Sequence, residues 1–149
     1  MGAPKGNEFW KLRSKHGRDK LFKSPDLLWI AATEYFKWCD ENPHKETKAF
    51  NGKEGVITTE IPKMRAYTMK GVCLYIGCSP DYFYSFEKNN KDSEDFIETL
   101  TRIREVIYEQ KFSGAASELL NPAFIGKDIG LIDRKDLNVK TEQPLFGNE

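Results

Sequence analysis

The residues that decide the fold are 68–86, which read TMKGVCLYIGCSPDYFYSF. A helix-turn-helix needs a small residue where its two helices cross, a glycine in the turn, and apolar residues at flanking positions. Cys73 and Gly77 meet the first two needs, and the flanking positions hold Val72, Ile76, Cys78, Phe83 and Phe86. Ser79-Pro80-Asp81 then supplies an N-cap and a first turn for the second helix. The stretch predicts a helix-turn-helix-like unit over residues 68–89, with Tyr82 and Ser85 facing outward as candidate DNA contacts. A tight helical corner without a DNA role is the alternative.

The second helix of this unit is poorly charged for DNA binding. Asp81 and Glu87 are opposed there only by Lys88, and an acidic surface repels phosphate. The whole chain has 23 basic and 23 acidic side chains, which excludes a uniformly basic nucleic-acid-binding protein. This neutrality is a cancellation, because residues 1–24 have seven basic and two acidic side chains (net +5) and residues 79–100 have two basic and six acidic (net −4).

Residues 1–24 are predicted to form a basic N-terminal arm. The segment is rich in Gly and Lys and has no sustained hydrophobic period, so we expect it to be extended or ordered only by contact. It is the first choice for a DNA-binding site, and a solvated tail is the alternative. The candidate DNA-binding cations are Lys5, Lys11, Arg13, Lys15, Arg18 and Lys20, with Lys88 and Lys91 as secondary candidates.

A helical body is predicted over residues 25–131. Ser24-Pro25 begins its first helix and Asn42-Pro43 ends it. One stripe of this helix is apolar and holds Leu28, Ala31, Ala32, Tyr35 and Cys39. A second, long helix begins after Asp92 or Ser93, and its apolar period runs through Gly114 to Leu119. A further helix follows Asn121-Pro122, so that the two helices together occupy residues 93–130.

Residues 46–61 change period and predict a β-hairpin inserted in the helical body. Residues rich in β-branched side chains lie on both sides of a turn at residues 51–55, which contains Gly52 and Gly55. Two strands alone are marginally stable in water, so this hairpin must pack on the helices or pair with another chain.

The last segment, residues 132–149, is predicted to be a flexible C-terminal tail. It is polar throughout, and Pro144-Leu145-Phe146 is its one apolar cluster. Arg134, Lys135 and Lys140 are opposed by four acidic side chains in residues 131–149, so DNA binding through this segment is not expected.

Nothing in the sequence predicts catalysis, a metal site or a cofactor. No Gly-rich phosphate loop is present, and the three cysteines, Cys39, Cys73 and Cys78, form no CxxC pair and have no neighbouring His. We expect them to behave as small buried hydrophobic residues. No run of residues is apolar enough to suggest a membrane span or a signal peptide.

Specific blocks of residues occur in order along residues 2–131. They are Gly2-Ala3-Pro4-Lys5-Gly6-Asn7, Phe9-Trp10, His16-Gly17-Arg18, Phe22-x-Ser24-Pro25-x-x-Leu28-Trp29, Tyr35-Phe36-x-Trp38, Lys63-Met64-Arg65-Ala66-Tyr67-Thr68, Gln110-Lys111-Phe112-Ser113-Gly114-Ala115-Ala116, Leu119-Leu120-Asn121, Ile125 and Asp128-Ile129-Gly130-Leu131. Through these blocks the chain resembles the small terminase subunit, the DNA-packaging protein of tailed bacteriophages. The resemblance is much more specific than the helix-turn-helix pattern alone.

The resemblance implies a non-enzymatic subunit with a mainly α fold that assembles as a homo-oligomeric ring. Such a ring would recognise viral double-stranded DNA and hand it to the large terminase subunit, whose ATPase and nuclease do the chemistry. No membrane or cofactor is implied. The protein is then expected in the host cell cytoplasm during phage assembly and not in the mature virion.

The resemblance also implies roles for three regions. The two helices of residues 93–130 would be oligomerisation helices that supply much of the subunit interface. The hairpin of residues 46–61 would join neighbouring hairpins around the ring. The tail would bind the large subunit, through Pro144, Leu145 and Phe146. The candidate interface residues are Ile103, Ile107, Phe112, Gly114, Ala115, Ala116 and Leu119.

Two other functions fit parts of the sequence. A dimeric helix-turn-helix transcriptional regulator would read DNA with Tyr82 and Ser85, although the acidic second helix disfavours this. An assembly scaffold without DNA binding would use only the hairpin and the long helix. A ring suits the arm better than either alternative, because several weakly binding arms on one rim act together.

Overall fold

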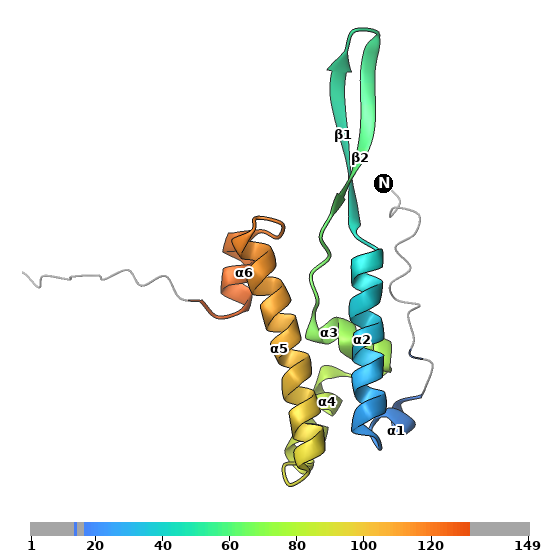
Figure 1. Cartoon of the computed structure of the whole chain (residues 1–149), viewed down its shortest axis with the longest axis vertical. Helices are drawn as coiled ribbons and strands as arrows, with labels where there is room; N and C mark the ends of the chain where they lie inside the picture. The colour runs from blue at the N-terminus through green and yellow to red at the C-terminus, as the bar shows by residue number, and fades with distance from the viewer. Residues whose placement is uncertain (1–13, 15–16, 132–149) are drawn as a thin grey trace, which may run out of the picture.

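The computed structural model describes residue 14 and residues 17–131. Two long helices, α2 (Pro25–Glu41) and α5 (Glu94–Ala116), pack together and run in the same general direction (Figure 1). Three shorter helices, α1 (Arg18–Leu21), α3 (Met69–Ile76) and α4 (Pro80–Asn89), pack against them, and α6 (Pro122–Asp128) folds back on α5. The strands β1 (His44–Gly52) and β2 (Gly55–Lys63) form a hairpin that projects from this helical body. The expectation of a mainly α fold with one hairpin is confirmed.

Helix α2 begins and packs as its sequence predicts. The Leu27 amide donates to Ser24 Oγ at 3.3 Å, so the serine side chain caps the helix while Pro25 occupies its first turn. The predicted apolar stripe is buried in the core, together with Phe36. The Asn42 side chain donates to the Trp38 carbonyl at 2.9 Å and satisfies one of the acceptors left at the helix end.

The stretch at residues 68–89 forms two short helices joined by a tight turn. The Thr68 hydroxyl accepts from the Gly71 amide and caps α3, and the Ser79 hydroxyl accepts from the Tyr82 amide and caps α4. Gly77 lies between the helices at φ +83°, a left-handed conformation that strains any residue with a Cβ. Of the predicted apolar positions, Val72, Cys73, Ile76 and Phe83 are buried, and Cys78 and Phe86 are half-buried.

The crossing of α3 over α2 depends on Gly71. The Tyr35 ring of α2 occupies the space where a side chain at this position would lie, and a Cβ there would overlap the Tyr35 hydroxyl. Tyr35 itself is 2% exposed, and burial raises its pKa to about 12. Its hydroxyl lies 3.4 Å from the Thr68 amide, which donates to it. The tyrosine therefore remains a neutral, hydrogen-bonded part of the core at physiological pH.

The first helix places the end of the predicted N-terminal arm against the helical body. Residues 18–21 are helical, and Leu21 and Phe22 are buried with 0% and 7% of their surface exposed. Residues 17–24 are thus ordered by contact with the helical body, which is one of the two states expected for this segment, while residues 1–13, 15 and 16 lie outside the described residues. Four residues are too few for a detectable hydrophobic period, so packing of Leu21 and Phe22 rather than helix propensity holds this turn in place.

The β-hairpin is confirmed and is longer than predicted. Its antiparallel ladder pairs His44 with Lys63 at the base and Gly52 with Gly55 at the tip, where Lys53-Glu54 forms a two-residue loop. Gly55 has φ +127°, which only glycine adopts without strain. Every residue from Thr47 to Glu60 except Gly52 is exposed. The hairpin therefore does not pack on the described helical body.

Helix α5 ends earlier than the apolar period predicts. It stops at Ala116, and Glu118 then adopts φ +59° while the Leu119 and Leu120 amides both donate to the Gly114 carbonyl. Helix α6 follows as expected, with the Asn121 side chain accepting from the Phe124 amide at 3.0 Å. The period continued to Leu119 in the sequence because a turn and a helix can place apolar residues at similar spacing.

We predict that Gly71→Ala destabilises the chain by about 1–3 kcal/mol, since the added methyl group must displace Tyr35 from a packed core. Gly126→Ala in α6 is the control, because a Cβ there meets nothing within 4 Å and alanine favours helix by up to about 1 kcal/mol. Urea denaturation followed by circular dichroism measures both variants. Equal stability of the two variants would contradict the packing role of Gly71.

Candidate nucleic-acid and assembly surfaces

Phe22 joins α1 to the second helix of the helix-turn-helix-like unit. Its ring makes edge contacts with the rings of Tyr82, Phe83 and Phe86, at centroid distances of 5.1, 6.2 and 4.6 Å. Such pairs add about 0.5–1.5 kcal/mol each beyond area burial. Two segments that are 60 residues apart in sequence are therefore held at one end of the molecule, which we call the α1–α4 corner (Arg18, Lys20, Tyr82 and Ser85).

The α1–α4 corner brings together DNA-binding candidates from two separate predictions. The Arg18 guanidinium lies over the Tyr82 ring, 4.8 Å from its centroid, a cation–π contact that limits where the cation can point. Arg18, Lys20, Ser85, Lys88 and Lys91 are all exposed, and Tyr82 is 38% exposed. The other candidates, Lys5, Lys11, Arg13 and Lys15, lie outside the described residues.

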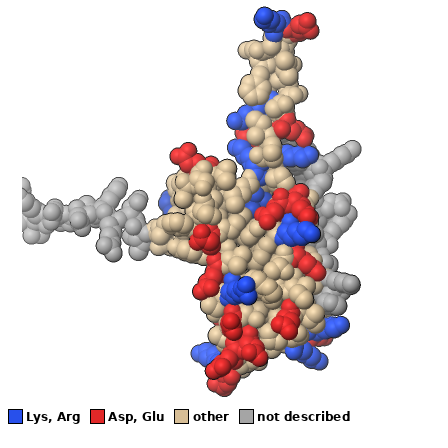
Figure 2. Space-filling view, viewed as in Figure 1, with Lys and Arg blue, Asp and Glu red and all other residues tan. Residues whose placement is uncertain are grey.

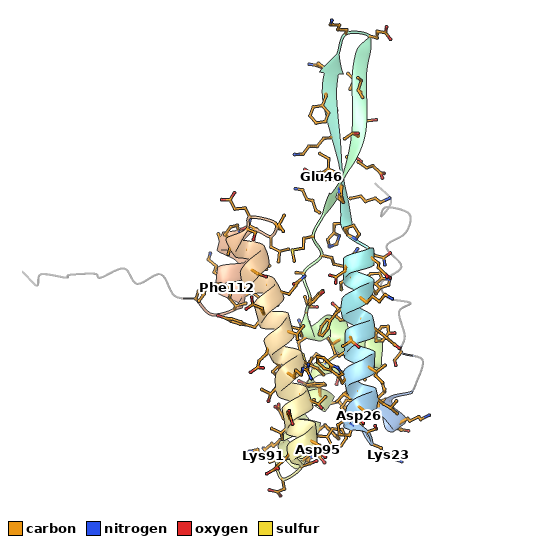
Figure 3. All side chains as sticks on the ribbon, viewed as in Figure 1. Lys23, Asp26, Glu46, Lys91, Asp95 and Phe112 are labelled. Carbon is orange, nitrogen blue, oxygen red and sulfur yellow. The ribbon has the colours of Figure 1, made fainter. Side chains whose placement is uncertain are left out.

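Acidic residues also lie at this end of the molecule. Figure 2 shows acidic and basic side chains next to each other at the lower end of the view, where the labels in Figure 3 place Lys23, Asp26, Lys91 and Asp95. On the α1–α4 corner itself, Asp19 lies 3.8 Å from Arg18, and both side chains are exposed. Exposed pairs of this kind contribute about 0–1 kcal/mol, so Arg18 remains able to exchange Asp19 for a phosphate.

The acidity of α4 is partly neutralised by a residue that sequence reasoning missed. Arg104 of α5 makes a two-pronged contact with the Glu87 carboxylate, in which Nη2 donates to Oε2 at 2.6 Å and Nη1 donates to Oε1. This hydrogen bonding lowers the pKa of Glu87, and burial opposes the shift only in part. The pair is separated by 17 residues, so no local spacing signal revealed it. With Glu87 paired, Asp81 is the remaining carboxylate of α4, and Lys88 lies on the same helix.

A polar groove lies between the starts of α2 and α5. It has a volume of about 310 Å³ and its walls carry three carboxylates, from Asp26, Asp95 and Glu98. Arg102 covers the Trp29 ring there at 4.4 Å from its centroid. Figure 3 shows Asp26 and Asp95 close to each other on the two helices. We call this the acidic groove; its negative charge makes it unsuited to phosphate.

The hairpin presents apolar side chains to solvent. Phe50 and Ile57 face each other across the two strands and are 52% and 61% exposed, and Val56 on the opposite face is 67% exposed. At the base, Lys63 pairs with Glu46 at 2.7 Å. Aromatic and β-branched residues on an exposed two-stranded ribbon are a typical assembly surface, because they gain stability only when another surface covers them.

The predicted interface residues of α5 divide into two groups. Ile103 and Ile107 lie in the chain's own core, so neither offers exposed surface to a second copy and their assignment to the interface needs correction. Gly114 is also buried, and its missing side chain admits Leu120 and Met64 of the same chain. Ala115 is half-buried, whereas Phe112, Ala116 and Leu119 are exposed; Figure 3 shows Phe112 near the upper end of α5. A regular spacing of apolar residues predicts that one face of a helix is buried, but it does not tell whether the same chain or a second copy covers that face.

The described residues contain no group of His, Cys, Asp and Glu side chains that could hold a metal ion. No helix among residues 17–131 is long and apolar enough to cross a membrane. Cys39 and Cys73 are buried, and burial raises the pKa of the Cys39 thiol. The hydrogen bond to Cys78, together with burial, also raises the pKa of Cys73, so neither buried thiol is an activated nucleophile.

A family model described as DNA-packaging protein gp3 matches residues 17–137. The chain is also 45% identical over 137 residues to a protein of Salmonella phage P22 named terminase, small subunit. That alignment covers 92% of this chain and 82% of the relative. The chain belongs to the family of DNA-packaging protein gp3. The resemblance to small terminase subunits is thereby confirmed.

The range matched by the gp3 family model begins where the continuous part of the structure begins. It includes α1, the hairpin, the α1–α4 corner and both helices of the predicted interface, and it leaves out Lys5, Lys11, Arg13 and Lys15. Of the basic candidates in residues 1–24, only Arg18 and Lys20 lie within both the range of the family match and the described helical body. Arg18 and Lys20 are therefore the basic candidates that we test by mutation.

We predict that Glu87→Gln removes part of the acid sensitivity of the fold. The lowered pKa of Glu87 means that its pairing with Arg104 stabilises the folded state above pH 4.5, its ordinary pKa, and that this contribution is lost as the pH falls through the lowered value. Because the side chains are 35% and 26% exposed, we expect a loss of about 0.5–1 kcal/mol at neutral pH. Stability of the variant will fall less steeply below pH 4.5 than that of the wild type.

Urea denaturation from pH 7 to pH 3 measures this effect. Glu105→Gln, at an exposed carboxylate on α5 next to Arg104 in sequence, is the control and keeps the wild-type pH profile. Identical pH profiles for Glu87→Gln and Glu105→Gln would contradict the assigned role of the ion pair.

Proposed function

We propose that this gp3-family chain is the DNA-recognition and regulatory subunit of a phage packaging motor. In this proposal it is non-catalytic, works as a homo-oligomeric ring on viral double-stranded DNA, and recruits the large terminase subunit, which supplies ATPase and nuclease activity. The observation that carries the proposal is the match of residues 17–137 to a DNA-packaging family, together with 45% identity to a terminase small subunit.

Ring assembly is supported by apolar surface that the single chain leaves uncovered. The hairpin stands clear of the helical body with Phe50, Val56 and Ile57 exposed, and the end of α5 adds Phe112 and Leu119. A hairpin of two strands is marginal by itself in water. In the proposed ring, each hairpin gains stability by contact with its neighbours, and the α5–α6 region supplies a second contact nearer the body.

DNA binding is supported by the α1–α4 corner. Arg18 lies over the Tyr82 ring, and Lys20, Ser85, Lys88 and Lys91 are also exposed on or next to α1 and α4. The charge per chain is small, so a single copy binds DNA weakly. Several copies on one ring raise the avidity above the affinity of one copy by about 10²–10⁴-fold, provided that they can engage the duplex together.

Recruitment of the large subunit is assigned to the tail. Pro144-Leu145-Phe146 is an apolar cluster in an otherwise polar segment, and short apolar motifs in such segments commonly bind partners by ordering on contact. The tail lies outside the described residues. The proposed site of action is the host cell cytoplasm during phage assembly.

We predict that Ile57→Asp weakens assembly at least tenfold, a change of about 1.4 kcal/mol, because the new carboxylate must lose its hydration when the apolar hairpin face is covered. Thr58→Asp is the matched control, since Thr58 is the next residue, is exposed and lies on the opposite hairpin face. Native mass spectrometry over a concentration series measures the assembly midpoint. A wild-type chain that stays monomeric at micromolar concentration would refute the ring, and a dimer as the largest species would favour the transcriptional regulator.

We predict that replacing Arg18 and Lys20 together by Ala weakens binding to duplex DNA and reduces its salt dependence. Each lost phosphate contact lowers the slope of log affinity against log salt concentration by about one. Lys37→Ala with Lys127→Ala is the control, because these exposed lysines lie on α2 and α6, away from the α1–α4 corner. Fluorescence anisotropy from 50 to 200 mM salt measures the slope. Equal slopes for the two double variants would exclude the corner as the DNA site.

A further inference from the structure

An apolar groove lies where four helices meet, on the side of α5 next to α6. It has a volume of about 210 Å³ and is lined by Met69 of α3, Tyr84 of α4, Ile107 and Tyr108 of α5, and Ile129 after α6, with Arg104, Lys111 and Asp128 at its edges. We call it the tail groove. Ile107 forms its buried floor, whereas Tyr84 and Tyr108 are 52% and 44% exposed.

The charged residues at the edges of the tail groove are already paired. Arg104 donates hydrogen bonds to the Glu87 carboxylate, and Lys111 Nζ lies 2.6 Å from Asp128 Oδ2. These two ion pairs fasten α4 and α6 to α5, so the walls of the groove are held in place. The surface offered between them is aromatic and aliphatic, and a ligand that fits it must supply apolar side chains rather than charge.

The dimensions of the tail groove favour a short peptide segment over a small-molecule cofactor. Pockets for small molecules usually measure about 300–1,000 Å³ and carry convergent polar groups, whereas this groove is smaller and its charged groups are already used. Two or three apolar side chains would cover the exposed faces of Tyr84 and Tyr108.

We propose that the tail groove binds the Pro144-Leu145-Phe146 segment of its own chain. Ile129 lines the groove, and the described part of the chain ends two residues later, at Leu131. Twelve residues, 132–143, then separate Leu131 from the apolar segment. Twelve residues reach at most about 40 Å when fully extended. The segment is therefore tethered beside the groove at an effective concentration of about millimolar.

The acidic groove is excluded as the binding site for the same segment. Residues 141–149 contain Glu142 and Glu149 and no basic side chain, so Asp26, Asp95 and Glu98 would repel them. The tail groove has no unpaired carboxylate among its lining residues. Of the two grooves, charge and apolar character both select the tail groove.

This assignment has a regulatory consequence, which rests on the proposed function. If the large subunit binds Pro144-Leu145-Phe146, it must take the segment from the tail groove, so the two contacts exclude each other. The segment is then withheld until a partner with higher affinity than the groove is present, which delays recruitment without any change in the helical body. Occupancy of the groove itself needs no large subunit and no DNA, and can be tested on the isolated chain.

The test places a photo-crosslinking side chain, p-benzoylphenylalanine, at Phe146 of the full chain. Irradiation followed by peptide mass spectrometry identifies the linked residues, and a mixture of isotopically light and heavy chains tells links within a chain from links between copies. The expected result is a link within one chain to residues 104–111 or 128–131. The same group placed at Asn138 is the positional control and gives a link to these residues at least fivefold weaker.

Two substitutions make the result specific. Leu145→Asp leaves the sequence of the helical body unchanged and is expected to reduce the groove link at least fivefold, and Tyr108→Asp in the groove does the same. Phe124→Asp, at a residue of α6 that is 70% exposed and does not line the groove, leaves the link unchanged. Links to other regions, links mainly between copies, or a groove link that survives Leu145→Asp would overturn the proposal.

Discussion

The missing side chain of Gly71 lets Tyr35 of α2 lie directly against the backbone of α3. This close approach sets how near α3 comes to α2, and the left-handed turn at Gly77 then sets the direction of α4. Phe22 packs on α4 and brings α1 to the same end. The position of the α1–α4 corner, which carries the exposed Arg18 and Tyr82, thus depends on Gly71 through three successive contacts. Its geometry is a consequence of the core rather than of its own charged residues.

The charge balance of the molecule also depends on tertiary contacts. Read along the sequence, α4 is an acidic helix unsuited to DNA. In the fold, Arg104 reaches Glu87 from α5 and stacks near Phe83 and Tyr84 at 5.8 and 5.5 Å, so one of the two carboxylates of α4 is held in an ion pair. The zero net charge of the chain therefore says little about phosphate binding. What matters is which charges remain unpaired on one face, and that depends on the packing of helices that are distant in sequence.

The helical body and the hairpin obey different physical requirements. The body buries its apolar stripes internally, and Ile103 and Ile107 show that a regular period on α5 is used first for the chain's own core. The hairpin has no buried apolar stripe of this kind, and its exposed Phe50 and Ile57 lie opposite each other across the two strands. Surface left uncovered in this way is the strongest structural argument for assembly, because a folded monomer gains nothing from exposed aromatic and β-branched side chains on an isolated ribbon.

The sequence by itself determined the elements whose signals are local. Caps at Ser24, Thr68, Ser79 and Asn121 lie at the helix starts. Gly55 of the hairpin and Gly77 of the α3–α4 unit lie where a positive φ requires glycine. Only the tertiary structure decided what covers each apolar face. It placed Leu21 and Phe22 in the core and paired Arg104 with Glu87. It also buried Ile103 and Gly114 within the chain, so that they are not available to a second copy. The physical reason is that capping and turn chemistry act over three or four residues, whereas burial and ion pairing depend on contacts between segments whose separation no local pattern records.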